Sequence, residues 1–117
     1  MLIVLGALAG LLGVALAAAA AHHSGGANLE TASRFLMLHA PVLLAVAALA
    51  ATGAVHPGIG RVAGWVIVLG LVLFCGDLAM RAFRGGALFP MAAPTGGFVL
   101  MAGWALIALA ALLRVWR

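Results

Sequence analysis

The sequence contains very little charge. Charged residues make up 7% of its 117 residues, whereas a soluble domain carries about 25%. Lysine and tyrosine are absent, all six basic residues are arginines, and the only acids are Glu30 and Asp77. A water-facing surface cannot be assembled from this composition. With 68% hydrophobic residues and a mean hydropathy of +1.32, the chain is predicted to be an integral membrane protein.

Several motifs of catalysis and ligand binding are also missing. The single Cys75 lies in an apolar run, so the chain forms no disulfide within itself. No C-x-x-C-H, H-E-x-x-H or G-x-S-x-G sequence occurs, and the glycine pairs match no nucleotide-binding pattern. The arginines are scattered, so the net charge of +4 indicates contact with lipid head groups rather than nucleic acid. The sequence therefore predicts no enzyme, no metal and no cofactor.

Four apolar runs are each long enough to cross about 30 Å of hydrocarbon as a helix. The expected spans are residues 2–21, 34–55, 62–80 and 96–113. The predicted fold class is all-α integral membrane, a compact antiparallel bundle of four transmembrane helices that forms one domain over residues 1–117. No basic residue precedes the first run, which favours a retained span over its rival interpretation, a signal peptide. In this run Gly6, Gly10 and Gly13 form a face that a neighbouring helix can approach closely.

The segments between the spans carry turn and capping signals. Asn28 is a fair N-cap with Glu30 in the first turn, so the second helix is expected to begin near Leu29. Residues 56–61 are expected to form a short turn. Residues 81–95 contain two prolines and a glycine pair and are expected to form the longest connection, lying in the membrane interface.

The arginine distribution does not decide the orientation in the membrane. We call the side with the first and third connections the loop side, and the opposite side the terminal side. Each side carries three arginines: Arg34, Arg81 and Arg84 on the loop side, and Arg61, Arg114 and Arg117 on the terminal side. The positive-inside rule therefore gives a tie. Because Asp77 offsets Arg81 and the N-terminal amine adds charge to the terminal side, both termini are expected in the cytoplasm.

Asp77 is the most unusual residue, because it lies inside an apolar run. A carboxylate at the centre of a membrane helix costs about 2.5–3.5 kcal/mol on insertion scales. The structural interpretation is an ion pair with Arg81, one helical turn away. The functional interpretation is a proton-exchanging or ligand-binding acid near the loop-side end of its helix, facing His39 or Arg34 across the bundle. The candidate functional cluster is Asp77, Arg81, His39, Arg34 and His22.

His39 is the second residue of interest, since it lies in an apolar run two residues before Pro41. The structural interpretation is a hydrogen-bond donor to a neighbouring helix. The sharper alternative is ligation, in which His22 and His39 hold a haem or a metal. The sequence contains no haem or metal motif that supports this alternative, so no cofactor is expected.

The chain resembles the YgdD family of small four-span proteins of bacterial inner membranes, which also has a mitochondrial relative. The likeness covers most of the chain, and four elements carry it. They are Ala21-His22 at the end of the first span, Arg34…His39 opening the second, Phe74, Gly76 and Leu78 in the third, and Pro94-Thr95-Gly96-Gly97 leading to Ala102-Gly103-Trp104. The chain departs from the pattern at Asp77, where a serine is expected, at Pro41, and in the order of Pro94 and Thr95. The resemblance implies the four-span architecture and a domain of unknown function.

Two functions are consistent with these features. The first is a structural or accessory subunit that packs in a larger membrane complex, respiratory for example, or that self-associates. The second is a small transporter or a module that handles protons or lipids, using the loop-side Asp/His/Arg cluster. In either case the expected partners are the lipid bilayer, other membrane subunits or a second copy, and the expected location is the bacterial inner membrane.

Overall fold

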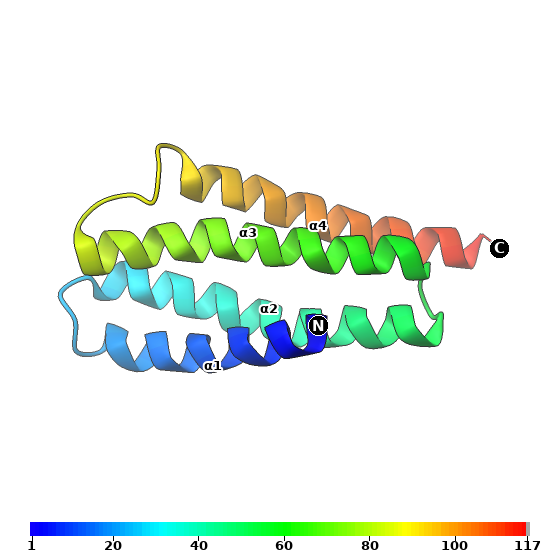
Figure 1. The fold of residues 1–117 in the computed structure, drawn as a ribbon, viewed down its shortest axis with the longest axis horizontal. Coiled ribbons are helices and arrows are strands. Elements are labelled where there is room, and N and C mark those ends of the chain that lie inside the picture. The colour runs from blue at the N-terminus through cyan, green and yellow to red at the C-terminus, as the bar shows by residue number, and fades with distance from the viewer. Residues whose placement is uncertain (117) are drawn as a thin grey trace.

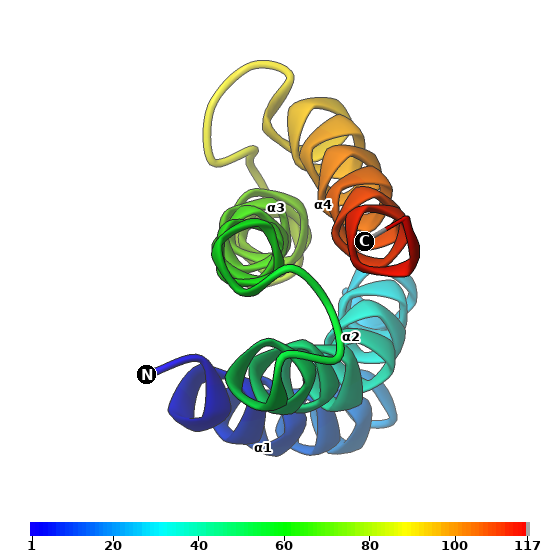
Figure 2. The same cartoon turned by 90° about the vertical axis from the view of Figure 1, so that its right-hand side faces the viewer.

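A computed structural model describes residues 1–116 as four helices joined by short connections. These are α1 (Leu2–Ala20), α2 (Gly26–Thr52), α3 (Pro57–Arg84) and α4 (Ala92–Val115). They run antiparallel, with α1 and α2 forming one hairpin and α3 and α4 the other (Figure 1). Seen end-on, α1, α2 and α4 form an arc and α3 lies on its concave side (Figure 2). All four helices are long and apolar enough to cross a membrane, so the predicted all-α membrane architecture is confirmed.

The spacing of two arginines in α3 matches the thickness of a membrane. Arg61 and Arg81 lie twenty residues apart in α3, which corresponds to about 30 Å of helix, the thickness of the hydrocarbon core. Helices α2 and α3 contain 27 and 28 residues, so both extend beyond the core. The predicted spans therefore lie within the helices, except that residue 21 and residues 53–55 fall in the connections.

The predicted start of the second helix is wrong. Gly25 is the N-cap of α2, so Asn28 lies inside the helix and Glu30 lies beyond its first turn. The capping signal at Asn28 does not mark the helix start, because packing stabilises helical residues that precede it. Leu29 is fully buried in the first turns of α2, and its burial holds those turns helical without a side-chain cap.

The other two connections are also shorter than predicted. Residues 57–61 belong to α3, whose N-cap is His56; the imidazole Nδ1 accepts a hydrogen bond from the Ile59 N–H at 3.3 Å. Proline at the first helical position suits a helix start, because its missing N–H has no partner to lose. The long connection covers only residues 85–91, since α3 continues to Arg84 and α4 begins at Ala92.

Helices within each hairpin pack through glycines. A Cβ atom added at Gly6 would lie 3.1 Å from the Ala40 carbonyl oxygen of α2, so α1 approaches α2 closely along the predicted glycine face. Between α3 and α4, a Cβ at Gly103 would lie 2.5 Å from the Ile67 side chain. Small residues allow close contact between membrane helices, where no hydrophobic force draws the helices together.

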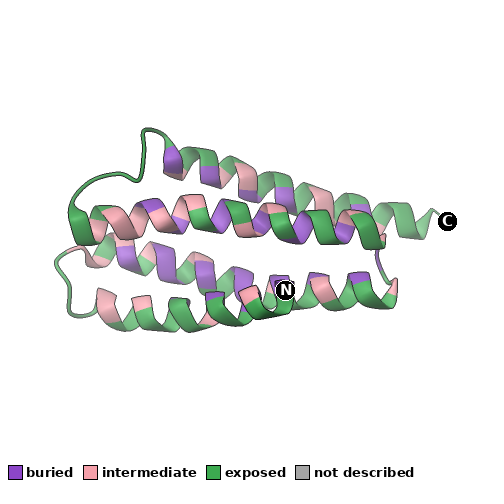
Figure 3. Ribbon diagram, viewed as in Figure 1, coloured by how far each residue is buried: buried purple, intermediate pink, exposed green. Residues whose placement is uncertain are grey.

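The outer faces of the helices are apolar, as a lipid-facing surface requires. Buried residues line the seams between helices, and exposed residues cover the outside (Figure 3). Large exposed side chains on the outside include Leu11 and Phe98, at 66% and 71% exposure. Helix α1 packs on α2 and barely reaches α3, so the bundle is open along one seam.

Candidate functional site

Three polar side chains are buried among the described residues: Ser33, His39 and Asp77. Each forms hydrogen bonds within the chain. The Ser33 hydroxyl donates to the Gly13 carbonyl oxygen of α1 at 2.8 Å. Across residues 1–116, no buried side-chain nitrogen or oxygen lacks a partner. The polar interior is therefore satisfied without any ligand.

Asp77 is fully buried and uses both carboxylate oxygens. Its Oδ2 accepts a hydrogen bond from Arg81 Nε at 2.8 Å, and its Oδ1 accepts one from the Leu88 backbone N–H, also at 2.8 Å. The predicted ion pair with Arg81 is therefore present. Because α3 continues to Arg84, Asp77 lies two turns from the helix end rather than one. The carboxylate thus joins α3 to the α3–α4 connection.

Arg81 connects this buried acid to the membrane surface. Its side chain is 46% exposed while that of Asp77 is fully buried. A long arginine side chain can keep its charged group at the head-group level while its stem lies against apolar surface. The pair therefore neutralises the carboxylate from the loop side.

His39 is 2% exposed and uses both ring nitrogens. Its Nε2 lies 3.1 Å from the Trp104 indole nitrogen of α4, and its Nδ1 lies 2.7 Å from the Phe35 carbonyl oxygen. An indole N–H can only donate, so Nε2 accepts and Nδ1 carries the proton. A bond to a neighbouring helix was predicted, but with His39 as its donor; instead it accepts from α4 and donates within α2.

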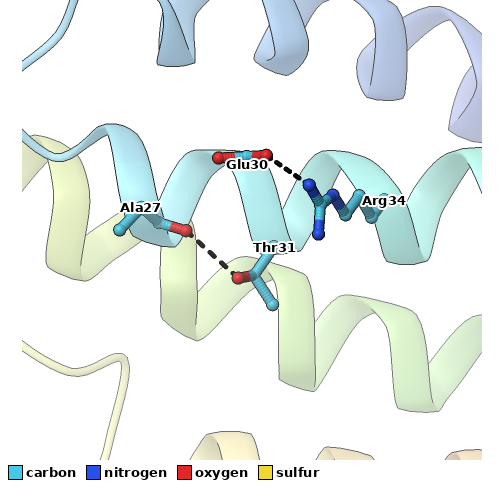
Figure 4. Close-up of polar contacts among 4 residues, drawn as sticks. All are labelled: Ala27, Glu30, Thr31 and Arg34. Carbon is cyan, nitrogen blue, oxygen red and sulfur yellow. Dashed lines mark hydrogen bonds and ion pairs between the residues drawn. The ribbon is translucent and has the colours of Figure 1, made fainter.

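Arg34 and His22 lie apart from these buried groups. Arg34 pairs with Glu30 on the surface of α2, next to the hydrogen bond from Thr31 to the Ala27 carbonyl (Figure 4). The side chains of Arg34 and Glu30 are 74% and 57% exposed. His22 is exposed in the α1–α2 connection. Neither residue has a hydrogen bond to Asp77 or His39 among the contacts of the described residues.

Of the five predicted cluster residues, the structure brings together only Asp77 and Arg81. Asp77 was predicted to face His39 or Arg34 across the bundle. Instead, each of these three residues has a different partner. Three residues that form the buried hydrogen bonds were not identified from the sequence: Trp104, Leu88 and Ser33. The only available signal was the tryptophan in the Ala102-Gly103-Trp104 element, which nothing in the sequence connects to His39.

The arrangement offers little to a metal or a haem. Within residues 1–116, no group of three or more His, Cys, Asp and Glu side chains lies close enough to hold a metal ion. His39, the inner of the two residues considered for haem, has neither ring nitrogen free. Ligation through Nε2 would replace the bond to Trp104 of α4.

The chain is similar to small bacterial membrane proteins. The family model "Protein of unknown function (DUF423)" matches residues 15–97. The UPF0382 membrane protein YwdK of Bacillus subtilis is 35% identical over 93% of this chain and 94% of its own. UPF0382 membrane proteins of Staphylococcus haemolyticus and Staphylococcus epidermidis are 29% and 28% identical, over 90% and 94% of this chain and 89% and 93% of their own. No solved structure matches the chain.

Proposed function

Since the chain belongs to the DUF423 family of membrane proteins, whose function is unknown, we propose that it is a non-enzymatic accessory subunit. It would act by packing against other membrane subunits or against a second copy of itself, without a cofactor. A respiratory complex is one assembly of this kind. The satisfied polar interior is the observation that carries the proposal.

An enzyme or transporter needs polar groups that can exchange their partners during a cycle. Here the buried groups of Asp77, His39 and Ser33 are each bonded within the chain. Two of these bonds join α2 to another helix, so a substrate or proton that took the place of a partner would loosen the bundle. The interior therefore favours a static packing role.

The chain also has little mass outside the membrane. Its connections cover residues 21–25, 53–56 and 85–91, and the outward faces of the helices are apolar. Contacts with a partner protein would therefore form mainly within the bilayer. Exposed aromatic side chains such as Phe98 and Trp65 lie on these outward faces.

The alternative is a transporter or a proton-handling module built on the loop-side cluster. It would require Asp77 to exchange its partner Arg81 for His39 or Arg34 during the cycle. Asp77→Asn would then abolish the transport activity while the fold remains intact. The existing pairings favour the accessory role over this alternative.

The finer assignments follow from the same proposal. The relatives are bacterial membrane proteins, which supports the proposed location in the bacterial inner membrane. The proposal that both termini lie in the cytoplasm rests on the charge distribution of the sequence alone. The likeness to YgdD proteins and their mitochondrial relative belongs to this proposal as well. The orientation is tested with a reporter protein that is active only in the cytoplasm. Fusions to the N-terminus and to the C-terminus should both be active.

The main test is purification in a mild detergent at native expression level, followed by mass spectrometry of the associated proteins. A tagged copy and an untagged copy should be expressed together, so that self-association is detected in the same experiment. A tagged, unrelated four-helix membrane protein is the control. A stoichiometric partner, or recovery of the untagged copy, is expected. A monomer without partners in both detergent and lipid nanodiscs would overturn the accessory role.

A further inference from the structure

A narrow groove separates α1 from α3, with α2 as its floor. Its volume is about 420 Å³, and we call it the α1–α3 slot. Cys75 is the one lining residue with a polar side-chain atom, and its thiol donates to the Ala32 carbonyl of α2. The slot is lined by Leu5, Leu8, Ala9, Leu12 and Leu16 of α1, Leu36 and Leu43 of α2, and Val68, Leu71, Val72, Cys75, Gly76 and Ala79 of α3.

Contacts between neighbouring segments lie beyond both ends of the slot. On the terminal side, Leu2 packs onto Gly64, where an added Cβ would lie 2.6 Å from a Leu2 methyl group. On the loop side, the rings of His23 and Phe83 meet edge to face, with centroids 5.0 Å apart. Between these contacts the slot opens sideways, past the exposed side chains of Leu12 and Val72. It is therefore continuous with the lipid-facing surface.

The depth of the slot matches one leaflet of a bilayer. Along α3 it extends from Val68 to Ala79, a helix length of about 16 Å. Ala79 lies two residues before Arg81, which marks the loop-side edge of the hydrocarbon. Half of the hydrocarbon thickness is about 15 Å. The slot therefore extends from just below the loop-side head groups to a few ångströms past the middle of the bilayer.

The α1 wall of the slot is unsuited to close packing of a protein helix. The seams that do hold helices in this chain contain glycines, such as Gly6 against α2 and Gly103 against α3. The α1 wall of the slot instead presents a row of leucines, which keep another backbone at a distance.

We infer that the α1–α3 slot binds one acyl chain of a phospholipid from the loop-side leaflet. The lining is apolar, as a hydrocarbon chain requires. The phosphate would lie at the level of Arg81 and Arg84, whose positive charge complements it. This inference does not depend on the accessory role, because the slot would bind lipid with or without a protein partner.

The test compares leucine substitutions inside and outside the slot. Gly76 lines the α3 wall of the slot, and a Cβ added there would have a single neighbour within 4 Å, Leu88 at 3.9 Å, so Gly76→Leu can add bulk at this wall without a clash. Ala79→Leu is a second filling variant. Gly97→Leu is the matched control, because an added Cβ there meets nothing within 4 Å and the residue does not line the slot. All proteins are purified from bacterial membranes in the same mild detergent, and their melting temperatures are compared.

Native mass spectrometry then counts the lipids that stay bound, and extraction identifies them. The wild type and Gly97→Leu should retain one phospholipid. Both filling variants should retain it at least about ten-fold less, because the leucine occupies the space of the acyl chain. Equal retention by all four folded proteins would overturn the inference. A quinone, or a protein segment, in place of the phospholipid would also overturn it. If one filling variant fails to fold, the other decides the outcome.

Discussion

Trp104 of α4 donates its indole N–H to Nε2 of His39 on α2, over a distance of 3.1 Å. The bond joins two helices that are not neighbours in the sequence. His39 is almost fully buried, while Trp104 remains 45% exposed on the outer side of α4. The buried acceptor on α2 thus receives its hydrogen bond from α4. This bond fixes the rotation of α4 about its own axis relative to the bundle.

Trp104→Phe should lower the free energy of unfolding. It removes the N–H donor and leaves Nε2 of His39 buried without a partner, which costs about 1–3 kcal/mol. Double-mutant cycles in membrane proteins give smaller couplings, about 0.6 kcal/mol on average. Unfolding in mixed micelles measures the change. Trp65→Phe is the control, since Trp65 is 48% exposed on α3 and its replacement should have little effect. Equal losses in the two variants would contradict a role for the His39 bond.

Asp77 should hold the α3–α4 connection in place. Asp77→Ala removes the acceptor for both Arg81 and the Leu88 N–H. The expected loss is about 2–3 kcal/mol, because a bond to a charged group contributes about 1.5–3 kcal/mol and the half-exposed Arg81 adds less than this. Asp77→Asn keeps an oxygen acceptor for Leu88 and should lose less. Thermolysin cleavage on the N-terminal side of Leu88, within the connection, should accelerate in the order wild type, Asp77→Asn, Asp77→Ala. Identical cleavage rates in all three proteins would show that the carboxylate does not restrain the connection.

The helices could be predicted from the sequence because each depends on a long uncharged run. The ion pair of Asp77 with Arg81 could also be predicted, because its partners lie one turn apart on one helix. The His39–Trp104 bond could not, since it joins residues 65 positions apart and depends on the rotation of α4. The Leu88 contact depends on the path of a connection that has no periodic pattern. The histidine cap of α3 was missed because Ser, Thr, Asp and Asn are the residues that signal an N-cap.

The surface pair Glu30–Arg34 should contribute little to stability. Both side chains are more than half exposed, and exposed pairs one turn apart on a helix contribute about 0.3–0.5 kcal/mol. Glu30→Gln should therefore change the free energy of unfolding by less than about 0.5 kcal/mol, far less than Asp77→Ala in the same micelles. A loss comparable to that of Asp77→Ala would mean that Arg34 is needed elsewhere in the bundle.

Gly96 and Gly97 should respond in opposite ways to the same substitution. A Cβ at Gly96 would lie 2.5 Å from the Phe74 backbone nitrogen and 3.0 Å from the Gly70 carbonyl oxygen, whereas a Cβ at Gly97 would meet nothing within 4 Å. Neither backbone atom can move without displacing α3, so Gly96→Ala should lose about 1–3 kcal/mol, the usual cost of overpacking.

Gly97→Ala should be neutral or stabilising by up to about 1 kcal/mol, because alanine favours the helix. Both changes add one methyl group to α4 at adjacent positions, so composition and helix propensity are matched and only the packing differs. Thermal unfolding of the two variants in one detergent measures the difference. If Gly96→Ala were as stable as Gly97→Ala, α3 and α4 would not be in the close contact that the glycine seam requires.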